Sequence, residues 1–136
     1  MDSMVVMLME KEVDSGFLVK EIGSYTVEQH GELIDGIFSI REEQKEVVHL
    51  RLTVGKDVED WEFSAIYDEY NPGVLEQHIL SFDELDESYN PTWKITFDFI
   101  ENQNTMERML NTILEIHKQE LDRVYGEIID KKSYYE

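Results

Sequence analysis

The stretch that decides the fold is residues 104–131, NTMERMLNTILEIHKQELDRVYGEIIDK. Apolar side chains recur in it every three or four residues, which is the period of an α-helix with one buried face. Asn104 is expected as the N-cap, with Glu107 in the capping-box position three residues later. The stretch therefore predicts a C-terminal helix of about 25 residues, or about 38 Å at the standard rise. Its apolar stripe comprises Met106, Leu110, Ile113, His117, Leu121, Val124 and Ile128.

The predicted helix is apolar over more than half of its circumference. Further apolar residues flank the stripe at Met109, Leu114, Ile116, Tyr125 and Ile129. Because a sheet covers only one side of a helix, the remaining apolar surface needs a second cover. We expect that cover to be a second copy of the chain, a partner protein or the segment 74–88.

The residues before 101 alternate between apolar and polar side chains, which is typical of strands with one buried face. In 47–54, for example, Val48, Leu50, Leu52 and Val54 form the expected core face. The predicted strands are 4–10, 17–25, 32–41, 47–54, 61–67 and 93–99, the first two forming a hairpin. The segment 74–88 fits a helix or a strand equally well.

These patterns together predict an α+β fold in a single domain, residues 1–136. An antiparallel, meander-like sheet of about six strands, residues 4–100, is expected to pack against the C-terminal helix, residues 104–131. The chain of 136 residues with 41% hydrophobic residues is large enough to bury a core of its own.

The chain contains no cysteine, which excludes disulfides, thiolate zinc sites, iron–sulfur clusters and a cysteine nucleophile. We therefore expect a cytoplasmic location. The apolar run at the N-terminus is short and lacks the features of a signal peptide. No run approaches the roughly 20 apolar residues of a membrane-spanning helix, so no membrane association is expected.

The charge is strongly and unevenly negative. The 31 acidic and 12 basic residues give a net charge of −19, which disfavours contact with nucleic acids or anionic membranes. Residues 57–93 include eleven acids and no lysine or arginine. We expect this block to bind a basic protein partner. The residues expected to do so are Asp57, Glu59, Asp60, Asp83, Glu84, Asp86 and Glu87.

His117 is the most informative single residue, because it interrupts the apolar stripe of the helix. One interpretation is a ligand-contacting imidazole in a pocket between helix and sheet, with Trp61, Trp93 and Phe97 as walls. The other is a neutral core histidine that hydrogen bonds to a backbone carbonyl or a tyrosine hydroxyl. The second is favoured, because buried polar groups are usually hydrogen-bonded.

Motifs for metal, cofactor or catalysis are missing from the sequence. The acidic clusters lack the spacing and glycine of a calcium loop, and His30, His49 and His78 fall in three separate segments. There is no phosphate-binding loop, dinucleotide fingerprint or nucleophile elbow. We therefore expect no metal and no cofactor, and assign no catalytic residue.

In its general composition the chain is similar to several bacterial groups of unknown function. In charge and size it is similar to secretion chaperones and to immunity proteins that neutralise basic toxins. No motif carries this likeness, so it implies no active residue.

Three functions are weighed from the sequence. The leading hypothesis is a non-enzymatic interaction module that docks a basic partner, or a second copy in a homodimer formed through the C-terminal helix. The second is a small-molecule carrier with an apolar pocket between sheet and helix. The third is an enzyme that uses His117 and strand carboxylates, drawn from Glu62, Asp68 and Asp98.

Overall fold

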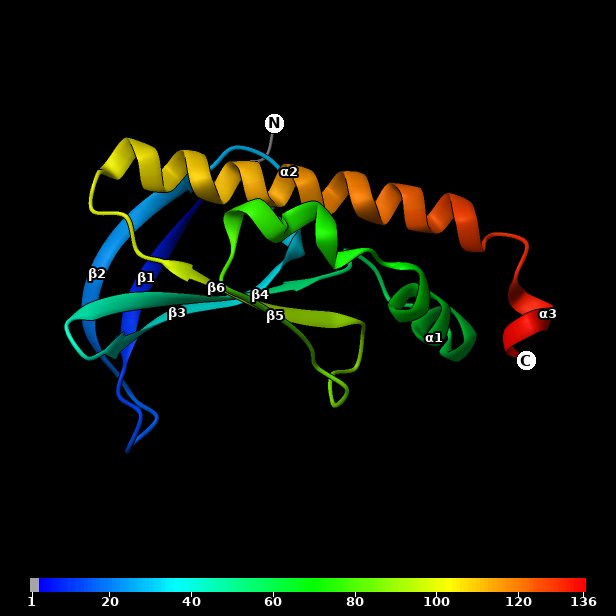
Figure 1. The fold of residues 1–136 in the computed structure, drawn as a ribbon, viewed down its shortest axis with the longest axis horizontal. Coiled ribbons are helices and arrows are strands. Elements are labelled where there is room, and N and C mark those ends of the chain that lie inside the picture. Colours follow the sequence, from blue (N-terminus) through cyan, green and yellow to red (C-terminus); the bar gives the residue numbers. More distant parts are fainter. Residues whose placement is uncertain (1–2) are drawn as a thin grey trace.

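The computed structural model describes residues 3–136 as one sheet with a long helix lying across one face (Figure 1). The strands are β1 (Met4–Lys11), β2 (Leu18–Val27), β3 (Ile34–Glu42), β4 (Lys45–Thr53), β5 (Ser81–Glu84) and β6 (Thr92–Asp98). The helices are α1 (Asp60–Glu69), α2 (Gln103–Ile128) and α3 (Lys132–Tyr135), with 3₁₀ turns η1 (Gly31–Leu33) and η2 (Pro72–His78). The predicted α+β architecture with a long C-terminal helix is confirmed.

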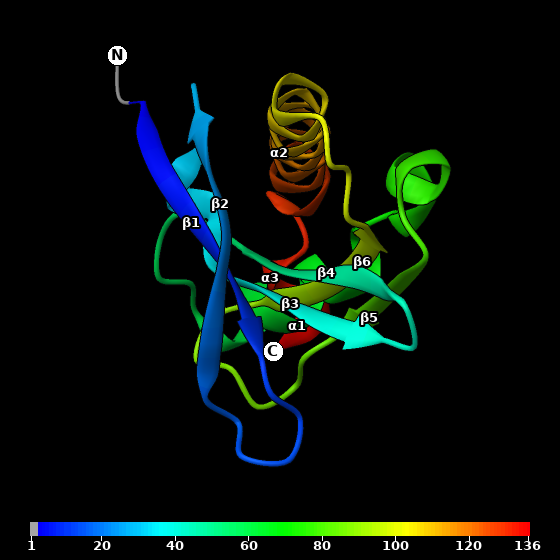
Figure 2. The same ribbon diagram turned by 90° about the vertical axis from the view of Figure 1, so that its left-hand side faces the viewer.

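The sheet is mixed, with the strand order β2-β1-β3-β4-β6-β5. Neighbouring strands are antiparallel except β1 and β3, which are parallel and share one register pair, Glu10 with Ser39, among the residues described. The prediction of a wholly antiparallel meander is therefore wrong. Since β2 occupies the outer edge, the chain passes through η1 and places β3 beside β1 rather than beside β2. The β1–β2 ribbon runs steeply across the direction of the other strands (Figure 2).

Residues 61–67 form part of helix α1 and not the predicted fifth strand. A capping box starts this helix: the Glu62 carboxylate accepts a hydrogen bond from the Glu59 N–H at 2.9 Å. Ala65 and Ile66 are fully buried and Tyr70, just after the helix, is 5% exposed, which is a helical rather than an alternating pattern. The sheet still has six strands, because β5 forms within the ambiguous segment 74–88.

Helix α2 begins and ends slightly earlier than predicted. The N-cap is Asn102 rather than Asn104, and its side chain accepts a hydrogen bond from the Thr105 N–H at 2.9 Å. The helix ends at Ile128, and α3 follows as a separate short turn. The difference is within the usual uncertainty of helix boundaries.

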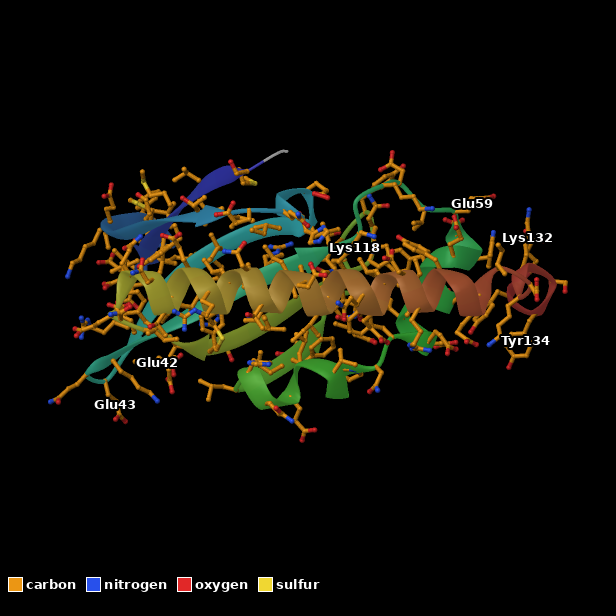
Figure 3. All side chains as sticks on the ribbon, turned by 90° about the horizontal axis from the view of Figure 1, so that it is seen from above. Glu42, Glu43, Glu59, Lys118, Lys132 and Tyr134 are labelled. Atoms are coloured by element: carbon orange, nitrogen blue, oxygen red, sulfur yellow. The ribbon has the colours of Figure 1, made fainter. Side chains whose placement is uncertain are left out.

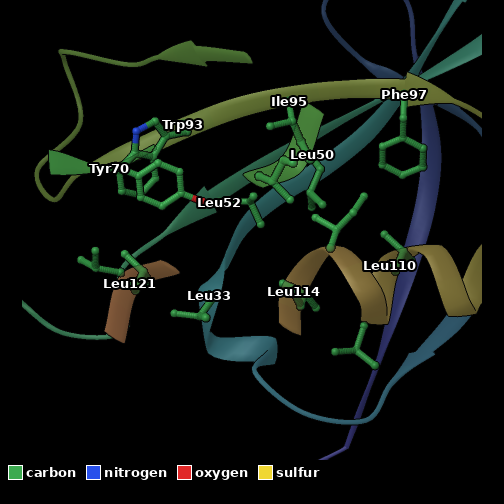
Figure 4. Close-up of a cluster of buried hydrophobic side chains, with 14 of the residues drawn as sticks. Leu33, Leu50, Leu52, Tyr70, Trp93, Ile95, Phe97, Leu110, Leu114 and Leu121 are labelled. Atoms are coloured by element: carbon green, nitrogen blue, oxygen red, sulfur yellow. The ribbon is translucent and has the colours of Figure 1, made fainter. Parts of the chain in front are cut away.

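The core lies between α2 and the sheet face that it crosses. Figure 4 shows Leu50 and Leu52 of β4, with Ile95 of β6, on the side that faces Leu110 and Leu114 of α2. All five side chains are fully buried. The complete burial of Val48, Leu50 and Leu52 agrees with the core face expected from the sequence of β4, although Val47 and His49 on its other face are also buried.

One flank of α2 is covered by the chain itself. Turn η2 lies along the helix (Figure 1), and its Leu75 is fully buried in the core. Part of the wide apolar surface is therefore covered by the segment 74–88, whereas Ile129, just beyond the helix, is 73% exposed.

None of the helices formed by residues 3–136 combines the length and the apolar character required to traverse a bilayer.

Candidate functional site

The two acidic segments predicted to bind a partner lie together in the structure. We call the end of the molecule that carries them the acidic end; it comprises Asp57, Glu59, Asp60, Asp83, Glu84, Asp86 and Glu87. Asn90 joins the segments, because its amide donates to Asp57 Oδ1 at 3.0 Å and accepts from the Val58 N–H at 3.2 Å. Tyr67 of α1 donates to the Leu85 carbonyl at 2.9 Å. These bonds fix the β5–β6 loop against α1 and the loop before it.

The acidic end is poorly neutralised. No ion pair among residues 3–136 involves any of its seven acids. Burial raises the pKa of Glu84, and the nearby Asp86 and Asp68 raise it further. Asp83 stands apart from this cluster, because it lies opposite Lys94 in the β5–β6 ladder. The remaining acids present a field that favours a cationic partner.

A pocket of about 480 Å³ opens at the acidic end between α1 and α3. It is lined by Glu59, Asp60, Trp61, Ser64, Tyr135 and Glu136. Tyr135 fixes α3 beside α1, because its hydroxyl donates to Asp68 Oδ2 at 2.8 Å. The pocket therefore combines carboxylates with an aromatic wall, which is a suitable environment for a lysine or arginine side chain.

His117, unlike the residues of the acidic end, is fully buried in the core, where it takes part in a hydrogen-bond network. Its Nε2 is 2.9 Å from the Thr53 carbonyl, which can only accept, so Nε2 carries the proton. Nδ1 is then the acceptor for the Tyr70 hydroxyl at 2.8 Å. Burial lowers the pKa of His117 to about 4, against smaller raising effects from the Thr53 carbonyl and Glu120. The imidazole is neutral and both ring nitrogens have partners.

A second group of hydrogen bonds lies close to this one along α2 and is centred on Glu120, whose side chain is 4% exposed. This carboxylate accepts from the Asn71 N–H at 2.8 Å and from Arg123 at 2.7 Å. Arg123 also donates to the Glu69 carbonyl at 2.8 Å. The hydrogen bonds to Glu120 raise the pKa of Arg123, with a further contribution from Glu69. The two groups thus tie α2 to the last residue of β4, through His117, and to the end of α1, through Arg123.

Of the four residues predicted to line an apolar pocket, Trp93 and His117 lie together in the core, with their ring centroids 5.4 Å apart. Trp93 and Phe97 of β6 are 0% and 1% exposed, and the Trp93 ring packs 4.5 Å from that of Tyr70 (Figure 4). Trp61 lies instead in the pocket of the acidic end. The carrier and enzyme hypotheses stay predictions; of the carboxylates drawn for the enzyme, Glu62 and Asp68 are on α1, and Asp98 ends β6.

A third group of polar residues, which the sequence analysis missed, lies where the β1–β2 ribbon joins the rest of the sheet. We call Glu10 and Glu46 the seam carboxylates, because they lie on the two sides of β3, on β1 and β4. The Ser39 hydroxyl donates to Glu46 Oε2 at 2.5 Å, and Arg41 Nη2 lies 3.3 Å from Glu46 Oε1. The Arg41 Nε is 3.9 Å from Glu10 Oε1. The seam therefore holds two carboxylates and one guanidinium around a fully buried serine.

The seam carboxylates affect each other's protonation. A hydrogen bond with Glu46 raises the pKa of Glu10, and burial raises it further. The pKa of Glu46 is lowered: burial opposes ionisation, but hydrogen bonds from Glu10 and Ser39 and the charge of Arg41 outweigh it. The pair is best described as a carboxylic acid, Glu10, that donates to a carboxylate, Glu46. No local motif signals this pair, because its members are far apart in the sequence.

Comparison with known proteins identifies a family but no function. The model of a family of unknown function, DUF6762, matches residues 1–136, so the chain belongs to this family. No curated protein matches the chain, and neither does any solved structure.

Proposed function

We propose that this member of the DUF6762 family is a non-enzymatic interaction module that docks a basic protein partner at its acidic end. The observation that supports the proposal best is the pocket between α1 and α3. Glu59, Asp60 and Trp61 all line this pocket. A lysine or arginine side chain of the partner would gain ion pairs and a cation–π contact in this pocket.

The distribution of ion pairs supports the same proposal. At this end of the molecule, Arg123 and Lys131 are both paired with Glu69, at 3.3 and 3.5 Å. They do not neutralise the acidic end itself. A cationic partner would therefore meet an unpaired negative surface, which speeds diffusional encounter and sets the orientation of docking.

Binding of a lysine- and arginine-rich peptide, followed by fluorescence anisotropy, tests the proposal. We expect binding at low ionic strength that weakens steeply with added salt, since exposed charges are screened. A glycine- and serine-rich peptide of equal length should not bind. Trp61→Leu should weaken binding by about threefold to tenfold, the range expected for a lost cation–π contact.

Charge reversal separates a local site from the effect of net charge. In the test variant, Asp83, Glu84, Asp86 and Glu87 are replaced by lysine. The control variant carries the same substitution at Glu12, Asp14, Glu42 and Glu43. Figure 3 shows Glu42 and Glu43 at the end of the molecule opposite Glu59. We expect only the test variant to lose peptide binding; equal losses in both would mean that net charge alone attracts the peptide.

Self-association is a separate part of this proposal. The exposed Ile129 lies just beyond the C-terminal end of α2, at the margin of its apolar surface. If α2 forms a homodimer, light scattering will give twice the mass of 16.1 kDa, and Ile129→Lys will restore the monomer mass. A monomer at all concentrations contradicts the homodimer and leaves the acidic end unaffected.

A further inference from the structure

The two edges of the sheet, β2 and β5, differ in how the rest of the chain covers them. At the β2 edge, side chains of α2 bind backbone carbonyls of the strand. Gln103 Nε2 donates to the Ser24 carbonyl at 2.6 Å, and Asn111 Nδ2 donates to the Thr26 carbonyl at 3.0 Å. Along β5, the backbone forms no hydrogen bond to any element other than β6 among residues 3–136. The β5 edge is therefore open to another strand.

The pairing of β5 with β6 shows which backbone groups are free. The Leu85 N–H donates to the Thr92 carbonyl of β6 at 2.9 Å. In an antiparallel ladder, alternate residues direct both backbone groups to the same neighbour, so Asp83 also faces β6. The backbone groups of Phe82 and Glu84 then point the other way, to the open edge. Each of these two residues offers an N–H donor and a C=O acceptor to a new strand.

An apolar pocket of about 320 Å³ adjoins the start of β5, between this strand and turn η2. Its apolar lining comes from Pro72, Ile79, Leu80 and Phe82. Leu80 is 58% exposed, so a large apolar side chain is left open to solvent beside the unpaired backbone. Peptides that add to a sheet edge gain affinity from backbone hydrogen bonds and specificity from pockets for alternate side chains. The β5 edge provides both features.

The charge of the β5 edge determines which kind of strand fits it. Asp83 and Glu84 are exposed on β5, and residues 57–93 contain no lysine or arginine. Besides burial, the charges of Asp86 and Asp68 raise the pKa of Glu84. A cationic side chain beside Glu84 therefore relieves repulsion. Two copies of the chain cannot easily pair at this edge, because their acids would meet.

We propose that the basic partner binds by adding an extended segment to the sheet as a new strand beside β5. The segment's backbone pairs with Phe82 and Glu84. One apolar side chain enters the pocket beside Phe82, and a lysine or arginine two residues away lies beside Glu84, since residues two apart share a face of a strand. This inference rests on the proposed function, because it specifies how the partner of the acidic end is held.

Backbone N-methylation of a synthetic peptide separates strand addition from attraction by charge. The probe is a peptide in which leucine and arginine alternate with threonine, so that leucine and arginine are two residues apart. Two versions carry N-methyl groups, one on every leucine and arginine and the other on every threonine. Only one of these sets of N–H groups can face β5. One version should therefore bind at least about tenfold more weakly than the parent peptide, and the other about as tightly.

The outcomes distinguish this inference from the proposed function. Equal affinities of the two methylated versions overturn strand addition but leave the acidic end as the binding site. Strand addition is also overturned if the parent peptide does not bind whereas the lysine- and arginine-rich peptide does. If neither peptide binds, both proposals fail.

Amide hydrogen exchange, followed by NMR, locates the new strand on the unaltered protein. The amides of Phe82 and Glu84 should exchange rapidly in the free protein and become protected when the parent peptide binds. The amide of Leu85 is bonded to β6 already and should change little. Unprotected Phe82 and Glu84 amides in the complex would overturn the proposal.

A matched pair of variants tests the backbone donor of Glu84. Glu84→Pro removes the charge and the N–H, and proline is tolerated where the N–H of an edge strand faces outward. Glu84→Gln removes the same charge and keeps the N–H. We expect the proline variant to bind the parent peptide about fivefold more weakly than the glutamine variant, the effect of one lost hydrogen bond. Equal affinities in the two folded variants would contradict pairing at Glu84.

Discussion

The network around His117 and the seam carboxylates are both polar groups enclosed by the fold, but they differ in how fully they are hydrogen-bonded. Both ring nitrogens of His117 have partners, at 2.8 and 2.9 Å. At the seam, Oε1 of Glu10 and Oε1 of Glu46 have no short hydrogen bond of this kind within the described part of the chain and lie 3.9 and 3.3 Å from the Arg41 guanidinium. Burial of a polar side chain is therefore a weak functional signal by itself.

The difference also separates effects on stability from effects on protonation. A fully bonded network contributes to folding, so changes to it should reduce stability strongly. A less completely bonded group contributes less to folding, so changes to it should mainly alter protonation. The following predictions test this contrast, beginning with the largest expected effect.

The largest effect should come from protonating His117. Its pKa in the folded protein is about 4, below the ordinary value of 6.5. Between these values the unfolded chain binds a proton that the folded chain does not, so stability is lost as the pH falls through this window. The free energy of unfolding should decrease by about 3 kcal/mol in total, at about 1.4 kcal/mol for each pKa unit. Urea unfolding between pH 7 and pH 4 measures the decrease.

The control for this prediction is His117→Gln. Carboxylates also titrate in this window, so the difference in slope between the two proteins isolates the contribution of the imidazole. The same pH dependence in both would show that the imidazole is not the group responsible.

A smaller loss is expected from Tyr70→Phe. The substitution removes the hydroxyl that donates to His117 Nδ1 and leaves that nitrogen buried without a partner. Tyr70 is 5% exposed, so water cannot easily replace the hydroxyl. We expect the free energy of unfolding to fall by about 2 kcal/mol in urea denaturation at pH 7. Tyr134→Phe, at a position 80% exposed, should leave stability unchanged; comparable losses in the two variants would contradict the role given to the hydroxyl.

The parts of the fold that the sequence predicted well are those with one clear period. The alternation in 47–54 and 93–99 corresponds to β4 and β6, and all of β6 pairs with β4 from Val47 to Thr53. Residues 61–67 were misassigned because their alternation coincides with a helical pattern that includes Tyr70, and the decisive signal was the capping box of Glu59 and Glu62. The parallel pairing of β1 with β3 leaves no trace in the periodicity, since alternation does not encode strand direction.

The candidate sites also differ in how well the sequence predicted them. The sequence predicted a hydrogen-bonded core histidine, and the structure gives His117 a tyrosine hydroxyl and a backbone carbonyl. The sequence also identified the acidic segments. It did not predict the hydrogen bonds by which Asn90, in the β5–β6 loop, contacts Asp57 and Val58 in the loop before α1. Glu10 and Glu46 were passed over because each lies in a charged strand end that resembles a solvated surface. Only the register across three strands brings them together.

A modest loss of stability is expected at the seam from Ser39→Ala. The hydroxyl of this fully buried serine is the donor to Glu46 Oε2. Its removal should lower the free energy of unfolding by about 1 kcal/mol, the usual value of one hydrogen bond. Chemical denaturation at pH 7 measures the change, and Ser133→Ala in the exposed part of α3 is the control. A loss as large as that of Tyr70→Phe would mean that the seam is as important for folding as the His117 network.

The smallest effect on stability is expected from Glu46→Gln, which should instead change the protonation of Glu10. The glutamine carbonyl can still accept from Ser39, and its amide can donate to Glu10, so the free energy of unfolding should stay within about 0.5 kcal/mol of the parent. The hydrogen bond with the Glu46 carboxylate is the main cause of the raised pKa of Glu10. Once the carboxylate is replaced by a donating amide, the ionised form of Glu10 is favoured and its pKa should fall toward the ordinary value of 4.5. An NMR titration of the Glu10 carboxyl carbon in both proteins measures this shift. An unchanged Glu10 pKa would show that the two carboxyl groups do not share a proton, and that burial alone raises it.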